Sequence, residues 1–214
     1  MGFRLTTADY VEWIAHAHAK IHANGEYITA LDAATGDGDH WTNINMGFEK
    51  LVAMSGELAT LPPAAALKKI GMTMMSVIGG SGGVLYGSAY IEAAKRLGDI
   101  EAFESKDICA MLQAMLDAIM SRGKSEPGFK TMIDALHPAV ECYKSCLERG
   151  EGTAQTLALV KQAALDGAQS TKDMPAVRGR AYYQADRGVG HLDPGAVTIA
   201  YQIETLMDFI NTKL

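Results

Sequence analysis

"TTADYVEWIAHAHAKIHAN", which runs from Thr6 to Asn24, shows the pattern that recurs along most of the chain. Several of its side chains are spaced three or four residues apart, which places them on one face of an α-helix. The residues on this face are Tyr10, Val11, Ile14, His18 and Ile21. Thr6 and Asp9 stand three residues apart, as in a helix capping box. The stretch therefore predicts a helix over residues 6–24.

The same helical spacing continues through the remainder of the sequence. It predicts seven further helices, over residues 41–56, 64–77, 84–97, 105–121, 130–149, 153–170 and 194–212. We find no convincing strand, because alternation of apolar and polar residues with β-branched enrichment is missing. We also find no repeat, linker or low-complexity segment. The sequence therefore predicts a single all-α domain that spans residues 1–214.

Composition narrows the class of protein. The chain has 214 residues, 48% of them hydrophobic, and a formal net charge of −6, which argues against nonspecific binding of nucleic acid. No apolar run reaches transmembrane length, and the first residues have no signal-peptide core. The three cysteines, Cys109, Cys142 and Cys146, include no CxxC pair and indicate reduced thiols. We therefore expect a cytoplasmic protein without nucleic-acid or membrane partners.

Glycine is concentrated in four segments between the predicted helices. These are "TGDGDH" (35–40), "IGGSGGVLYG" (78–87), "SRGKSEPGFK" (121–130) and "RGRAYYQADRGVGHLDPG" (178–195). In a bundle of antiparallel helices, alternate connections lie at the same end. Binding residues are often found on loops that a rigid scaffold holds. The four segments are therefore expected to meet at one rim and to form a site there.

"LDAATGDGDHWTN" (31–43) holds three aspartates, Asp32, Asp37 and Asp39, and no basic residue. A turn with a helix cap would explain one or two of them. A divalent cation would explain all three, and Mg²⁺ prefers such hard oxygen ligands. An EF-hand is excluded by spacing, because position twelve counted from Asp37 is Phe48 instead of glutamate. The three aspartates are therefore predicted to bind metal.

The remaining glycine segments each have two interpretations. "GGSGG" (79–83) is either a turn between helices or a nest for an anion, but not a Walker loop, since no GK[ST] follows. Asp193 and Pro194 are a typical helix start, while Arg178, Arg180 and Arg187 suit phosphate. In "GFKTMIDAL" (128–136), Lys130, Thr131 and Met132 stand at a helix start, where they could either pack in the core or cap the helix, or contact a ligand.

Together, "ALDAATGDGDHWTN", "GGSGGVLYG", "GFKTMIDAL" and "RGRAYYQADRGVGHLDPGA" resemble the signature segments of the L subunits of dihydroxyacetone kinases, in the same order. The resemblance covers nearly the whole chain. It implies an eight-helix up-and-down barrel with a site for ADP or ATP on one rim. It further implies that Asp32, Asp37 and Asp39 hold two Mg²⁺ ions. The residues that it places at the nucleotide are His40, Trp41, Thr42, Asn43, Ser81, Gly82, Gly123, Met132, Arg180, Asp193, Pro194 and Gly195.

The sequence departs from the family pattern at three places. Trp41 stands where glycine is usual, Gly82–Gly83–Val84 replaces the common Ser-Gly-Pro, and Phe129 replaces an acidic residue. Trp41 is thus a candidate for altering the mouth of the pocket and the choice of substrate.

The resemblance implies a phosphoryl-donating kinase subunit without catalytic acid or base residues of its own. A separate K subunit would bind dihydroxyacetone or a related ketose and supply those groups. A retained ADP would be rephosphorylated by a phosphotransferase-system protein. The alternatives are direct use of ATP, another ketose such as erythrulose, and a role as nucleotide-sensing partner of a transcription regulator. A homodimer is a further expectation.

Overall fold

The computed structural model describes residues 2–214, and these form ten α-helices and two short 3₁₀ helices. The helices are α1 (Thr7–Ala23), α2 (Gly25–Thr35), α3 (His40–Ala53), α4 (Ser55–Leu58), α5 (Pro63–Val77), α6 (Gly80–Leu97), α7 (Ser105–Gly123), α8 (Ile133–Glu148), α9 (Thr153–Ser170), η1 (Thr171–Asp173), η2 (Arg180–Tyr183) and α10 (Pro194–Asn211). Residues 2–214 contain no strand, only an isolated bridge between Leu5 and Phe103. The predicted all-α class is confirmed.

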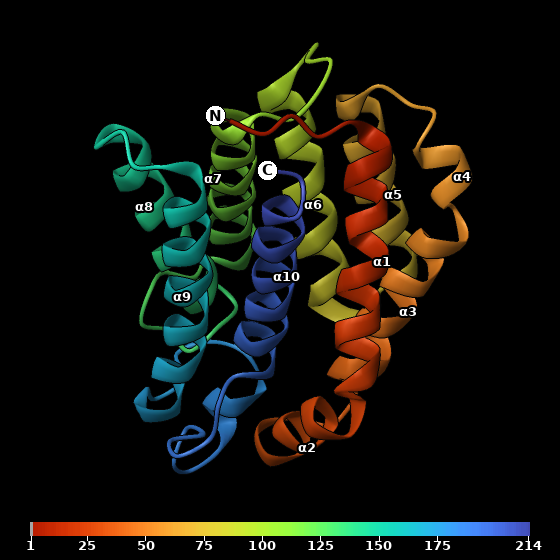
Figure 1. Cartoon of the computed structure of the whole chain (residues 1–214). Coiled ribbons are helices and arrows are strands. Elements are labelled where there is room, and N and C mark those ends of the chain that lie inside the picture. The colour runs from red at the N-terminus through yellow and green to blue at the C-terminus, as the bar shows by residue number, and fades with distance from the viewer. Residues whose placement is uncertain (1) are drawn as a thin grey trace.

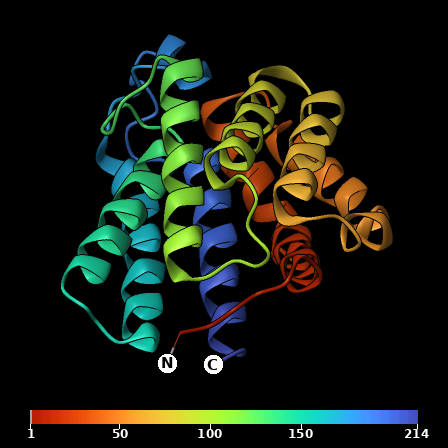
Figure 2. The same ribbon diagram turned by 90° about the horizontal axis from the view of Figure 1, so that it is seen from above.

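Eight of the helices pack side by side in a closed ring (Figures 1 and 2). Each helix contacts the next one in the order α1, α3, α5, α6, α7, α8, α9 and α10, and α10 contacts α1, which closes the ring. Most residues of α10 are buried, and Trp13 Nε1 of α1 donates a hydrogen bond to Thr205 Oγ1 of α10 at 3.1 Å. The ring agrees with the expected up-and-down arrangement, and both chain ends lie opposite α2 (Figure 1).

The helices that the sequence did not predict are α2 and α4. Helix α2 has only three buried residues, Ile28, Asp32 and Thr35, so its apolar stripe is too short to give a clear period. Asp32 consequently lies in the last turns of a helix, where a loop was expected. Helix α6 also begins four residues before the predicted residue 84, so the "GGSGG" segment forms its first turn.

Glycines allow two pairs of helices to approach closely. A Cβ atom added to Gly71 of α5 would lie 2.8 Å from the carbonyl oxygen of Gly87 in α6. A Cβ added to Gly167 of α9 would lie 2.2 Å from the carbonyl oxygen of Asp134, at the start of α8. The α8–α9 contact is important for the site, because the segments that precede α8 and follow α9 both reach the same rim.

We predict that Gly167→Ala destabilises the protein by about 3 kcal/mol, because the added methyl group meets backbone atoms that cannot move aside. Gly152→Ala, at the other end of α9, is the matched control, since a Cβ added there would have no atom within 4 Å. Urea denaturation of both variants measures the difference. Equal midpoints for the two variants would contradict the close α8–α9 contact.

Candidate functional site

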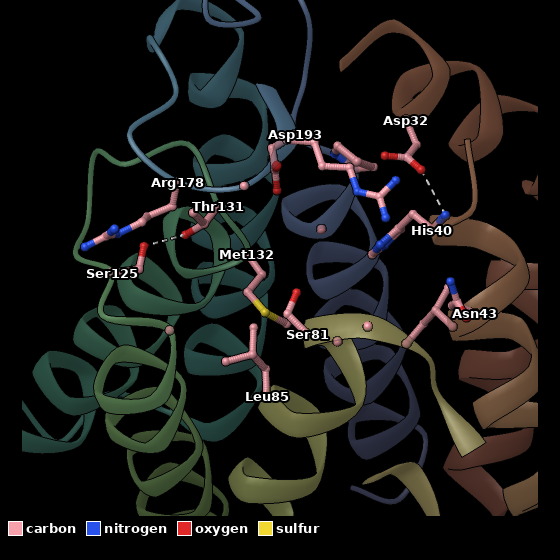
Figure 3. Close-up of a pocket in the computed structure, with 18 of the residues that line it drawn as sticks. Asp32, His40, Asn43, Ser81, Leu85, Ser125, Thr131, Met132, Arg178 and Asp193 are labelled. Carbon is pink, nitrogen blue, oxygen red and sulfur yellow. Dashed lines mark hydrogen bonds between the residues drawn. The ribbon is translucent and has the colours of Figure 1, made fainter. Parts of the chain in front are cut away.

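Four glycine-rich connections meet at one end of the helix ring and surround a cavity of about 580 Å³ (Figure 3). They are the α2–α3, α5–α6 and α7–α8 connections and the long connection from η1 to α10. Among the residues predicted to bind metal or nucleotide, those that line this cavity are Asp32, Asp37, Asp39, His40, Asn43, Ser81, Gly82, Gly123, Met132, Arg180, Asp193, Pro194 and Gly195. The predicted convergence of the four segments is thus found in the structure.

The three aspartates form a cluster on one wall of the cavity. Asp32, Asp37 and Asp39 each offer a carboxylate oxygen, and these oxygens lie within 4.8 Å of one another. Asp32 is buried, and its Oδ2 accepts a hydrogen bond from the backbone N–H of His40 at 2.9 Å. A Cβ at Gly36 would lie 2.5 Å from Asp32 Oδ1, so a larger residue there would displace the Asp32 carboxylate. Three converging carboxylates are a donor set that fits Mg²⁺.

Arg180 supplies the positive charge that the sequence around the aspartates lacks. Its guanidinium forms an ion pair with Asp37, and its Nη2 lies 3.9 Å from Asp39 Oδ2. Arg180 is the first residue of η2, in the segment from residue 174 to residue 193 that we call the arginine loop. Gln184 of this loop donates a hydrogen bond from Nε2 to the carbonyl of Ala34 in α2 at 3.0 Å. The arginine loop is therefore held against the aspartate cluster.

His40 connects the start of α3 to α10. Its Nε2 lies 3.0 Å from Thr198 Oγ1, and the Thr198 hydroxyl donates to the carbonyl of Gly195 at 3.1 Å. Burial lowers the pKa of the His40 imidazole, and the nearby Asp32 carboxylate opposes this shift. The ring is therefore mainly neutral at pH 7 in the unliganded protein. It fixes the α3 and α10 ends of the cavity relative to each other.

The first turn of α6 opens toward the cavity. Asn43 joins it to the aspartate segment, because its Oδ1 accepts from Gly79 N at 3.2 Å and its Nδ2 donates to Asp39 O at 3.1 Å. Gly80 has a φ of 64°, which favours glycine. Ser81 lies at the cavity (Figure 3). The unpaired N–H groups and positive dipole end of an 18-residue helix are suited to an anion.

Asp193 caps α10, as its place before Pro194 predicts. Its Oδ2 accepts from Ala196 N at 2.7 Å, and its own N–H donates to Thr171 Oγ1 at 2.9 Å. Burial of the carboxyl group raises its pKa to about 7, although the Ala196 hydrogen bond and the Lys130 charge lower it. Asp193 therefore organises the α10 end of the cavity.

Trp41 and Thr42 differ from the other predicted residues, because neither lines the cavity. Thr42 is exposed on α3. The Trp41 indole donates from Nε1 to the carbonyl of Ile21 at 3.2 Å, and a Cβ at Gly25 would lie 2.7 Å from its ring. Trp41 thus packs α3 against the α1–α2 junction, although its neighbours His40 and Asn43 on α3 line the cavity.

Several cavity residues were not predicted as site residues. Ser125, Thr131 and Arg178 lie on the wall opposite Asp32, and Leu85 lies below them (Figure 3). Arg122 and Lys130 also line the cavity. Ser125 and Thr131 have hydroxyl oxygens 3.5 Å apart, and Arg178 Nε donates to the carbonyl of Lys124 at 3.0 Å. The sequence marks Arg178 as suited to phosphate and leaves a ligand contact open for the segment that holds Thr131. Ser125 and Leu85 have no signal beyond membership of the glycine-rich segments. The cavity thus has one acidic wall and one wall with basic and hydroxyl groups.

Comparison with known proteins identifies the family. The DAK2 domain profile matches residues 34–208, which include most of the cavity residues. The chain belongs to the DAK2 domain family. The chain is 35% identical over 202 residues to the "PEP-dependent dihydroxyacetone kinase, ADP-binding subunit DhaL" of Escherichia coli strain K12, covering 94% of this chain and 96% of that protein. It is 33% identical over 207 residues to the "PTS-dependent dihydroxyacetone kinase, ADP-binding subunit DhaL" of Lactococcus lactis, covering 96% and 99%.

Solved structures support the fold of this DAK2 domain. The dihydroxyacetone kinase of C. freundii in complex with AMP-PNP and Mg²⁺ aligns with a TM-score of 0.71 and 26% identity. The alignment covers 94% of this chain and 33% of that kinase, so the DAK2 domain corresponds to about a third of the larger protein. Among residues 2–214 no helix is long and apolar enough to span a membrane.

Proposed function

We propose that this DAK2 domain is the phosphoryl-donating, Mg²⁺–nucleotide-binding subunit of a dihydroxyacetone kinase. The observation that carries the proposal is the cluster of Asp32, Asp37 and Asp39 beside Arg180, on the wall of a cavity large enough for a nucleotide. The relatives named as ADP-binding subunits support it, because they align over nearly their whole length. The proposal treats residues 1–214 as one nucleotide-binding domain.

In this proposal the two walls have different tasks. The aspartate cluster holds Mg²⁺, which, when bound, neutralises phosphate charge and orients the phosphoryl group. The first turn of α6 and Arg180 bind phosphate oxygens. Met132 and Leu85 offer apolar surface for the base, and Arg122 and Arg178 lie within reach of the ribose or phosphates. No residue of this chain is assigned as catalytic acid or base.

Charge favours two Mg²⁺ ions over one. The three carboxylates and ATP together carry about −7; one Mg²⁺ leaves about −5 and two leave about −3. Arg180 and the N-terminus of α6 can offset part of the remainder. A site with one ion would leave a large uncompensated charge in a half-enclosed cavity. We therefore propose two ions.

A separate subunit would bind the ketose and meet the rim of the cavity. Tyr183 is 86% exposed there, and Tyr182 and Val189 are also exposed. The guanidinium carbon of Arg187 lies 5.2 Å from the centre of the Tyr182 ring. Tyrosine and arginine are enriched in energetically important parts of protein interfaces. The exposed face of the arginine loop is therefore our proposed docking surface for the ketose-binding subunit.

The proposed docking surface predicts that Tyr183→Ala weakens binding of the ketose-binding subunit by about tenfold, which corresponds to about 1.4 kcal/mol. The affinity for Mg-ADP should not change, since Tyr183 does not line the cavity. Leu147→Ala is the control, because this side chain is exposed near the end of α8 that lies away from the rim. Surface plasmon resonance measures the binding; equal affinities for the two variants would exclude this surface.

The relatives' names also favour a particular phosphoryl source. Both are described as depending on PEP or on a phosphotransferase system. We propose that ADP stays bound and is rephosphorylated in place by a protein of that system. The three free thiols of Cys109, Cys142 and Cys146 support a cytoplasmic location, where such proteins act.

A single-turnover experiment tests the proposed function. The protein is loaded with Mg²⁺ and ATP labelled at the γ-phosphate, freed of excess nucleotide, and mixed with dihydroxyacetone and a ketose-binding subunit from a relative. We expect label in dihydroxyacetone phosphate only when Mg²⁺ and both subunits are present. Label that goes to water at the same rate without the ketose-binding subunit would instead identify a hydrolase.

A further inference from the structure

Lys130 is buried beside the cavity in an unusual environment. It is 2% exposed, and of the lysines and arginines in residues 2–214 it alone is buried. Its backbone φ is 60°, a conformation that side-chain-bearing residues rarely adopt. Its Nζ donates hydrogen bonds to two backbone carbonyl oxygens, that of Thr171 at 2.5 Å and that of His191. Lys130 is among the residues that line the cavity, but its ammonium group is paired with these backbone acceptors.

One of the two carbonyl groups lies just before the arginine loop, and the other lies near the end of the loop. Thr171 begins η1, immediately before the loop, and His191 lies two residues before the α10 cap Asp193. Other contacts bring the same segments together: Val177 N donates to Phe129 O at 3.1 Å, and Gly190 N donates to Lys172 O at 2.7 Å. Lys130 therefore joins both ends of the arginine loop to the start of α8.

The charge of Lys130 is balanced by its surroundings. Burial lowers the pKa of its ammonium group, while the charges of Asp193, Asp134, Asp173 and Asp186 oppose that shift. A buried charge is tolerated when fixed acceptors surround it, and a buried carbonyl that loses its donor is costly. Glycine at position 188 leaves room for the side chain, since a Cβ there would lie 3.2 Å from Lys130 Cε.

We infer that Lys130 is a positioning residue, whose ammonium group closes the arginine loop so that Arg180 faces Asp37 and Asp39. The consequence for nucleotide binding rests on the proposed function above, whereas the closure of the loop does not. Lys130 would act on the nucleotide through Arg180, without touching it. Loss of the ammonium group should therefore release the arginine loop and remove the contribution of Arg180.

Hydrogen–deuterium exchange of the unliganded protein tests the closure. In Lys130→Met we expect amides of residues 174–193 to exchange at least about tenfold faster, while those of α5 and α6 stay protected. Lys172→Met is the matched control, because Lys172 is exposed in the same region and should leave the exchange unchanged. Unchanged exchange in Lys130→Met would overturn the inference, whatever the protein binds. If this variant does not form a helical protein, Lys130→Gln, which also lacks the ammonium group, takes its place with the same expected increase in exchange.

A double-mutant cycle with Mg-ADP tests whether Lys130 acts through Arg180. We expect Lys130→Met and Arg180→Ala each to weaken binding by about tenfold, and the double variant to bind within about threefold of Arg180→Ala alone. Independent effects that multiply to about a hundredfold would show a direct nucleotide contact for Lys130 and would overturn the positioning role. Absence of Mg-ADP binding by the unmodified protein would refute the proposed function and leave the exchange result to stand by itself.

Discussion

Replacing Asp37 by asparagine is expected to abolish Mg²⁺-dependent nucleotide binding and to leave the helical fold intact. The amide removes one of three carboxylates whose oxygens lie within 4.8 Å, so the cation loses a charged ligand. It also removes the ion-pair partner of Arg180. We expect the affinity for Mg-ADP to fall by at least about a hundredfold, or about 2.7 kcal/mol. Isothermal titration calorimetry measures the affinity, and circular dichroism checks the helices.

Asp99→Asn is the control for this result. Asp99 is an exposed aspartate in the α6–α7 connection, at the end of the helix ring opposite the cavity (Figure 1). The same change from carboxylate to amide should have no effect there on Mg-ADP binding. Tight Mg-ADP binding by Asp37→Asn would refute the assignment of the aspartate cluster as the metal site.

Arg180→Ala is expected to slow phosphoryl transfer by about a thousandfold, within the range seen when an arginine that stabilises phosphoryl-transfer charge is removed. The affinity for Mg-ADP should fall much less, by about tenfold, because the metal and the first turn of α6 still hold the phosphates. The reason is that a guanidinium contributes most where charge develops during transfer. Rapid-quench measurement of labelled dihydroxyacetone phosphate gives the rate.

Two further variants separate charge from geometry. Arg180→Lys keeps a positive charge without the planar donor set, so we expect only partial recovery of the rate. Arg187→Ala removes another arginine of the same loop, which does not line the cavity, and should transfer at the normal rate with saturating ketose-binding subunit. Equal loss of rate in Arg180→Ala and Arg187→Ala would show a general effect of the loop and contradict a specific role for Arg180.

The sequence predicted the eight long helices because each buries a regular apolar stripe. It did not predict α2, where Asp32 occupies one of only three buried positions. Nor did it predict the orientation of Trp41, because helical spacing does not determine which neighbour an aromatic side chain contacts at a helix start. The indole instead packs on Gly25 at the α1–α2 junction.

The sequence predicted the acidic residues of the site better than its basic and hydroxyl-bearing residues. The aspartates are close in sequence, and their repulsion is itself a signal for a cation. Arg122, in the last turn of α7, and Ser125, in the α7–α8 connection, line the cavity because the end of α7 lies at the rim, which helical spacing does not predict. Lys130 gave no signal for burial, since lysine is almost never fully buried without partners and its partners are backbone carbonyls from a distant segment.

Calorimetric titration of ADP into the unmodified protein, once with Mg²⁺ and once with excess EDTA, tests the metal-dependent nucleotide site most simply. We expect one ADP to bind per chain with Mg²⁺ and binding to weaken by at least about a hundredfold in EDTA, because phosphate and aspartates then repel each other. Absence of binding in Mg²⁺, or equal affinity in both solutions, would contradict a metal-dependent nucleotide site at Asp32, Asp37 and Asp39.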